Sequence, residues 1–221
     1  MVCAAIYFTI KFLKKQRKTE IEKLELVTAL QEAELAVLKN QINPHFLFNA
    51  LNNIRSLILS EPEKARKMVT HISDLLRYSI QFNAQEKVSL NEEIEIVKYY
   101  LFLEGIQFNE RLKYSIQVDP NTESYQIPPM AIQILVENTI KHGLSLLKHG
   151  GEIHIITEKH DDFLGISVTN TGQLNSDSKR EGIGIKNLME RMKILFGEFA
   201  EFELKNLSEH KVEAKLKIPL S

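Results

Sequence analysis

The chain has 221 residues, of which 43% are hydrophobic, and this length and composition support one large folded domain or two small ones and exclude a disordered chain. Its 28 Lys and Arg residues nearly balance 29 Asp and Glu residues, so the chain has no net positive charge that would attract a polyanion. We therefore expect no direct nucleic-acid partner. The single cysteine, Cys3, excludes a disulfide framework and a thiolate metal cluster within one chain, which fits a reducing cytoplasm.

The N-terminal segment, residues 1–18, combines an apolar run with a basic cluster. The apolar residues Val2 to Ile10 precede the Lys and Arg residues, which is the reverse of the order in a secretory signal peptide. Crossing a bilayer takes about 20 apolar residues, so this run cannot span one alone. Two interpretations remain open: the inner end of a transmembrane helix that starts upstream, or a short amphipathic anchor. Both predict a membrane-proximal segment, with the rest of the chain at the cytoplasmic face of the inner membrane.

Residues 19–85 predict a helical dimerisation domain. A long helix is expected from Thr19 to about Ser60, because its apolar residues follow the three-and-four spacing of a coiled-coil seam that continues to His45. Pro44 removes one backbone donor and predicts a kink beside that histidine.

A second helix is expected from about Pro62, and the two helices predict a hairpin. The apolar face of the second helix consists of Ala65, Met68, Val69, Ile72, Leu75 and Leu76. A two-helix hairpin cannot bury both of its faces, so we expect a homodimer in which a second copy completes a four-helix bundle.

Residues 86–221 predict a domain of mixed helices and strands, which makes the chain α+β. Ser89 and Glu92 have the spacing of a capping box for a third helix that ends near Asn109. Period-two alternation then predicts four strands, at residues 114–118, 153–155, 164–168 and 212–218. Helical runs from Pro128 to His142 and from Ile185 to Phe196 lie between these strands, which predicts an α/β sandwich with mostly antiparallel hairpins. The polar stretch from residue 171 to 181 predicts a mobile loop that acts as a lid.

Three polar side chains share one face of the predicted helix at 128–142, beside its apolar stripe. They are Asn138, Lys141 and His142, which three- and four-residue spacings stack one turn apart. An amide oxygen can ligate Mg²⁺ while cations neutralise phosphate oxygens, so this face could hold a metal-bound triphosphate. A solvated helix face is the alternative.

Two further features lie downstream of this helix. Strand alternation points Asn170 inward, where it needs a polar partner: the amino group of a buried adenine, or the turn made with Thr171 and Gly172. Gly182 and Gly184 immediately precede a helix, and free N–H groups at a helix start attract phosphate. The spacing is not that of a Walker motif.

An Asn-bearing helix, an inward polar strand end, a lid and a Gly-x-Gly helix start, in this order, resemble the N, G1 and G2 boxes of the GHKL (Bergerat) ATP-binding fold. Upstream, the sequence QINPHFLFN at residues 41–49 resembles the phosphoacceptor segment of the LytS/YehU-type sensor histidine kinases. Four more segments are similar to that family: LLRY at 75–78, YLFLE at 100–104, ENTIKHG at 137–143 and GIKNL at 184–188.

The resemblance implies a dimeric kinase core that uses ATP and Mg²⁺ to phosphorylate its own His45. It also implies a response regulator, of the LytTR type, whose Asp receives the phosphoryl group. Asn138 would ligate Mg²⁺, and Lys141 would neutralise charge in the transfer. The other nucleotide contacts that it implies are His142, Asn170, Gly172, Gly182 and Gly184.

The sequence differs from the usual pattern of these kinases at two positions. Asn170 stands where the superfamily usually has an Asp that accepts from the adenine amino group, and an amide accepts that bond without charge assistance. Phe46 stands where many histidine kinases have an acidic residue, which leaves Asn49 as a candidate to orient the imidazole. Two other functions remain open: a GHKL ATPase with Glu137 as the water-activating base, and a non-catalytic dimerising module.

Overall fold

The computed structural model describes residues 11, 13–18, 20, 44–81, 85–144, 147, 150–174 and 182–220. The chain divides into two compact units, Met1–His45 and Phe46–Ser221. The described residues 11–20 of the first unit are helical. The predicted coiled-coil seam before Pro44 and most of the predicted lid lie outside the described residues. No helix in the described ranges combines the length and the apolar character needed to cross a membrane.

The described helices match the helices predicted from the sequence. They are α2 (Pro44–Leu57), α3 (Pro62–Gln81), α4 (Leu90–Phe108), α5 (Ala131–His142) and α6 (Ile183–Phe196). Short 3-10 turns follow or precede them at Asn109–Arg111, Pro120–Thr122 and Gly197–Phe199.

The strands form a two-stranded and a five-stranded sheet. They are β1 (Val88–Ser89), β2 (Leu112–Val118), β3 (Gln126–Ile127), β4 (Gly151–Lys159), β5 (Phe163–Thr171), β6 (Glu201–Ser208) and β7 (Lys211–Pro219). The larger sheet has the order β2-β4-β5-β7-β6, with every pair antiparallel except β2 and β4. The predicted α+β class, a helical hairpin followed by an α/β sandwich, is confirmed.

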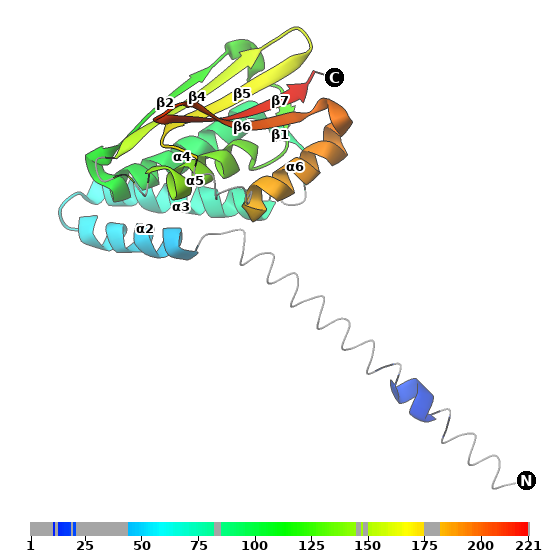
Figure 1. Ribbon diagram of the computed structural model, residues 1–221. Coiled ribbons are helices and arrows are strands. Elements are labelled where there is room, and N and C mark those ends of the chain that lie inside the picture. The colour runs from blue at the N-terminus through cyan, green and yellow to red at the C-terminus, as the bar shows by residue number, and fades with distance from the viewer. Residues whose placement is uncertain are drawn as a thin grey trace, which may run out of the picture. The chain divides into compact units, whose positions relative to one another are not determined.

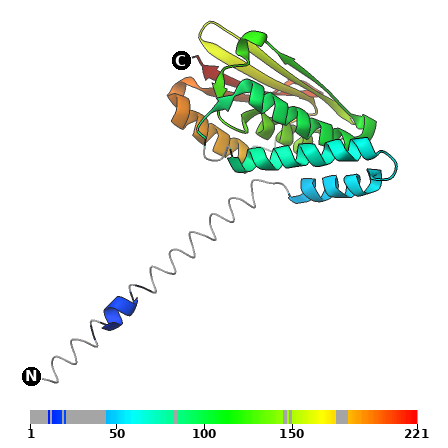
Figure 2. The same ribbon diagram turned by 180° about the vertical axis from the view of Figure 1, so that it is seen from behind.

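Helices cover one face of the five-stranded sheet in layers. Figures 1 and 2 show α4 and α5 against the sheet, α3 beyond them and α2 outermost. The core lies between the sheet and the helix layer. Its fully buried side chains include Leu101 of α4, Leu135 of α5, and Ile153, Ile155 and Leu164 of the two central strands β4 and β5. This packing fixes α5 against both α4 and the sheet.

Several details differ from the sequence prediction, which did not include the short strands β1 and β3. The edge strand β6 was not predicted, because Phe202 and Leu204 are its only partly buried apolar side chains and its alternation is weak. Val69, placed on the apolar face of α3, is 50% exposed. Helix α5 begins at Ala131 instead of Pro128, because Met130 has a left-handed φ of 65° that ends the preceding turn.

The predicted capping box at the start of α4 is present. The Ser89 hydroxyl accepts from the Glu92 N–H at 3.2 Å, and the Glu92 carboxylate accepts from the Ser89 N–H at 2.9 Å. Two donors at the helix start are thereby satisfied.

Replacing this cap tests how much it stabilises the fold. We expect Ser89→Ala to lower the free energy of unfolding by about 1 kcal/mol, because a first-turn N–H loses its acceptor. Urea denaturation measures the change. Ser73→Ala, at an exposed position inside α3, is the control, and an equal loss in both variants would contradict the capping role.

The buried carboxyl group of Glu104 makes the free energy of unfolding depend on pH. Burial raises the pKa of Glu104 to about 7; the hydrogen bond from Tyr100 lowers it, and the nearby Glu137 carboxyl raises it. The folded chain therefore keeps the proton up to about pH 7, whereas the unfolded chain releases it near pH 4.5. Between these values the free energy of unfolding must fall as pH rises.

Glu104→Gln should remove this fall, because an amide does not titrate. At pH 8 we expect the variant to be more stable than the wild-type chain by about 3 kcal/mol, with equal stability near pH 4. Urea denaturation at several pH values between 4 and 8 measures the slope. Glu95→Gln, which changes a largely exposed carboxylate on the same helix, should keep the wild-type slope, and an unchanged slope in Glu104→Gln would refute the account.

Candidate functional site

The last two turns of α5 carry three of the predicted site residues. Asn138 is half-buried, whereas Lys141 and His142 are exposed. The apolar stripe beside them is core, with Leu135 and Val136 at most 1% exposed. The amphipathic pattern of α5 thus keeps the amide and the two basic side chains outside the core.

Gly182, the N-cap residue of α6, lies beside Asn138, and Gly184 is the second residue of α6, whereas the sequence placed both glycines before the helix. A Cβ at Gly182 would lie 3.9 Å from the Asn138 Oδ1, and a Cβ at Gly184 would lie 3.4 Å from Ile134 of the same helix. Segments more than 40 positions apart in the sequence therefore meet here. The first backbone N–H groups of α6 have no side-chain cap, so the positive end of this helix lies close to the Asn138 amide.

Asn170, at the end of β5, is 6% exposed, as its strand alternation predicted. In the ligand-free chain its Nδ2 donates to the Thr171 carbonyl at 2.8 Å, and its Oδ1 accepts from the Thr139 hydroxyl at 3.4 Å. The bond to Thr171 fits the interpretation in which Asn170 caps the following turn, and its amide oxygen faces α5. Thr139, which is 6% exposed, therefore links Asn170 to α5.

Two glycines make room for the Asn170 amide. A Cβ at Gly143 would lie 2.5 Å from Asn170 Nδ2, a distance that no side chain tolerates. Gly172 has a φ of 152°, and a Cβ there would lie 3.1 Å from the same nitrogen. The end of α5 and the end of β5 are held together at this point.

Charges around α5 shift the pKa values of two predicted site residues. Burial raises the pKa of Glu137, and the Glu93 carboxyl raises it further; the hydrogen bond that Gln133 donates at 2.7 Å opposes both. Desolvation, and then the charge of Lys141, lower the pKa of His142. At neutral pH the His142 ring is therefore mainly neutral and would contact a phosphate oxygen through an N–H donor.

The donor atoms of the site suit a hard, oxygen-preferring cation. The described residues contain no group of three or more His, Cys, Asp or Glu side chains that could hold a metal by themselves. One amide oxygen beside a helix start is a fitting partial ligand set for Mg²⁺, which usually takes one or two protein oxygens and completes its shell with phosphates and water. Asn138 is the residue that would hold it.

The predicted phosphoacceptor lies at the start of α2. His45 is exposed and belongs to the Met1–His45 unit, whereas the other predicted site residues belong to the Phe46–Ser221 unit. The next residue, Phe46, is buried, and its ring centroid lies 5.1 Å from that of Tyr100 on α4. Asn49, the candidate orienting residue, is half-buried one helical turn further on.

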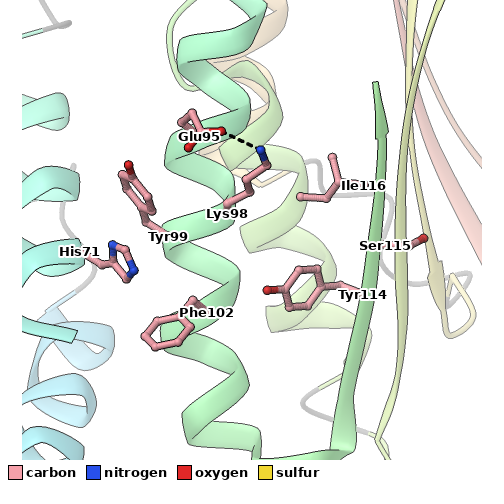
Figure 3. A pocket seen from close by; sticks show the side chains of 8 residues that line it. All are labelled: His71, Glu95, Lys98, Tyr99, Phe102, Tyr114, Ser115 and Ile116. Carbon is pink, nitrogen blue, oxygen red and sulfur yellow. Dashed lines mark hydrogen bonds and ion pairs between the residues drawn. The ribbon is translucent and has the colours of Figure 1, made fainter. Parts of the chain in front are cut away.

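A pocket of about 400 Å³ lies among α3, α4 and β2, apart from these residues (Figure 3). Its aromatic lining is Tyr99, Phe102 and Tyr114, and an ion pair of 2.6 Å between Lys98 and Glu95 lies above them. None of the predicted site residues lines it. Its lining offers no cluster of phosphate-binding groups.

The sequence profile of the histidine kinase family matches residues 33–112. The sensor protein LytS of Enterococcus faecalis is 34% identical over 204 residues, which cover 86% of this chain and 35% of that protein. The sensor histidine kinase YesM of Bacillus subtilis is 31% identical over 220 residues, which cover 97% of this chain and 37% of that protein.

Among solved structures, the histidine kinase domain of a blue-light-activated histidine kinase from Erythrobacter litoralis has a TM-score of 0.49 and 15% identity. That match covers 84% of this chain and 93% of that domain. The chain spans about a third of the length of the curated relatives it matches. By the profile match and the identity to these relatives along most of its length, the chain belongs to the LytS-type sensor histidine kinases.

Proposed function

We propose that this chain is the kinase core of a two-component sensor, which binds ATP with Mg²⁺ on α5 and phosphorylates its own His45. The observation that carries the proposal is the approach of Gly182 to the Asn138 amide oxygen, which sets a metal ligand beside a helix start. Family membership supplies the reaction class, and the exposed His45 supplies an accessible nucleophile.

The residues of the site would divide the binding of the nucleotide among them. Asn138 would hold the cation, which neutralises charge on the phosphates when bound. Lys141 and the N–H groups that follow Gly182 would hold phosphate oxygens. Asn170, buried at the end of β5, would accept from the adenine amino group through the oxygen that now faces Thr139.

In the reaction, a ring nitrogen of neutral His45 would donate its lone pair to the γ-phosphorus. A P–N bond forms while the bond from the γ-phosphorus to the β,γ-bridging oxygen breaks, and ADP leaves with that electron pair. The imidazole loses its N–H proton to water. In the following transfer, a response-regulator Asp carboxylate would attack the same phosphorus; the P–N bond breaks, and the imidazole takes a proton back from water and leaves as the neutral ring. Catalysis would rest on positioning and charge neutralisation.

The hairpin supports the proposal of a homodimer. Phe48 and Leu51 on α2 are 67% and 56% exposed, and Val69 on α3 is half exposed. A second copy would cover such faces by forming a four-helix bundle. We also propose that the apolar and basic segment at residues 1–18 attaches the chain to the inner membrane, and that the regulator is of the LytTR type.

Incubation with γ-labelled ATP and Mg²⁺ tests the proposed reaction. The wild-type chain should take up label that is labile in acid and stable in alkali, as a phosphoramidate is. His45→Ala should take up none. Asn138→Ala should weaken ATP-Mg binding in calorimetry by more than about tenfold, because a cation ligand is lost.

The matched control is His210→Ala, which removes an exposed imidazole in the turn between β6 and β7 and should label like the wild-type chain. Label that persists in His45→Ala would place the acceptor elsewhere. Inorganic phosphate released without protein labelling, and abolished by Glu137→Gln, would establish the ATPase instead. If the chain does not bind ATP-Mg at millimolar concentration, the remaining interpretation is a non-catalytic dimerising module.

Asn170→Asp tests the base contact. A carboxylate accepts the adenine amino hydrogen bond with charge assistance, which should tighten ATP binding by about 1 kcal/mol, or roughly fivefold. The same change replaces the Nδ2 donor to the Thr171 carbonyl by an oxygen, so the nucleotide-free variant should be less stable. Calorimetry and urea denaturation measure the two effects. Tighter binding of ITP, whose base lacks the amino group, to the same extent would argue against this contact.

A further inference from the structure

A buried carboxylate on α4, Glu93, holds the start of α5. Glu93 is 0% exposed, and it accepts from the backbone N–H of Met130 at 2.9 Å, of Ile132 at 3.1 Å and of Gln133 at 3.1 Å. These are the N–H groups of the residue before α5 and of its second and third residues, the donors that a side-chain cap normally satisfies.

Helix α5 has no cap of its own at this end. Met130 occupies the cap position with φ 65° and makes no side-chain cap hydrogen bond. A cap within the same segment would fix only the local turn. Because the acceptor here belongs to another helix, Glu93 fixes the start of α5 relative to α4.

The same carboxylate is bonded to the hairpin. The hydroxyl of Tyr78, near the end of α3, donates to the Glu93 oxygen that also accepts from Met130. Burial, and then the Glu93 charge, raise the pKa of Tyr78 far above its ordinary value, so the phenol keeps its proton and remains a donor. One oxygen atom therefore joins the end of α3 to the start of α5.

The candidate nucleotide-binding residues lie at the other end of the helix whose start Glu93 fixes. Asn138 follows Ile132 by six residues, about 9 Å along the axis of a rigid α-helix, so a tilt at the start displaces the Asn138 amide. We infer that Glu93 and Tyr78 are positioning residues, which set where Asn138 lies relative to the α2–α3 hairpin. The inference rests on the proposed function of α5 as the nucleotide-binding helix.

Glu93→Gln and Tyr78→Phe test the two links separately. Glu93→Gln puts an NH₂ group among the N–H donors of α5, so the Michaelis constant for ATP should rise by about fivefold or more. Tyr78→Phe leaves the cap in place, so the Michaelis constant should stay within about twofold while the turnover number for His45 labelling falls about tenfold. The assay temperature is one at which circular dichroism shows that every variant is fully folded. The controls are Glu95→Gln on the outer side of α4 and Tyr114→Phe on β2, both in Figure 3.

Amide hydrogen exchange in the nucleotide-free full chain provides a readout that does not depend on catalysis. Both variants should accelerate exchange at residues 138–142 by roughly tenfold relative to the two controls. Unchanged exchange across α5 in both variants would overturn the inference. So would accelerated exchange with wild-type kinetic constants, because Glu93 and Tyr78 would then only stabilise the fold. Accelerated exchange in a chain that neither binds ATP nor labels His45 would support the positioning of α5 and refute the proposed function.

Discussion

The arrangement of the three central helices depends on one carboxylate that is withdrawn from water. A buried charge is costly unless hydrogen bonds surround it, and a buried N–H without an acceptor costs roughly 1–3 kcal/mol. At Glu93 the hydrogen bonds offset both costs, because three N–H donors at the start of α5 and the Tyr78 hydroxyl all donate to the two carboxylate oxygens. Each member of this group satisfies another, so the carboxyl group links α3, α4 and α5.

The far end of α5 is fixed by a different kind of contact. There Gly143 and Gly172 leave space for the Asn170 amide, which bonds to Thr139 on the helix and to Thr171 on the strand. Helix α5 is thus held by charge at its start and by close backbone packing at its end. The residues on its outer face, Asn138 among them, take their position from both ends.

The sequence predicted the features that neighbouring residues determine and missed those that depend on distant ones. The cap at Ser89, the buried strand β5 and the inward Asn170 follow from spacings of two to four residues. The bonds to Glu93 come from backbone groups 37–40 positions away, and no local pattern contains them. Edge strand β6 was missed for another reason: it buries few apolar side chains, and its sequence is correspondingly polar. The approach of Gly182 to Asn138 was anticipated only through the family resemblance, because tertiary packing creates it.

The residue after the proposed acceptor histidine, His45, is an apolar anchor, whereas many histidine kinases have an acidic residue at this position. Phe46, Ala50 and Ile54 are at most 9% exposed, and their four-residue spacing forms one buried stripe along α2. Successive helical residues differ by about 100° around the axis, so burial of Phe46 turns the preceding side chain away from that stripe. The exposure of His45 follows from this rotation. Since Phe46 packs on Tyr100 of α4, the rotation of the acceptor helix is set by the same helix whose Glu93 fixes α5.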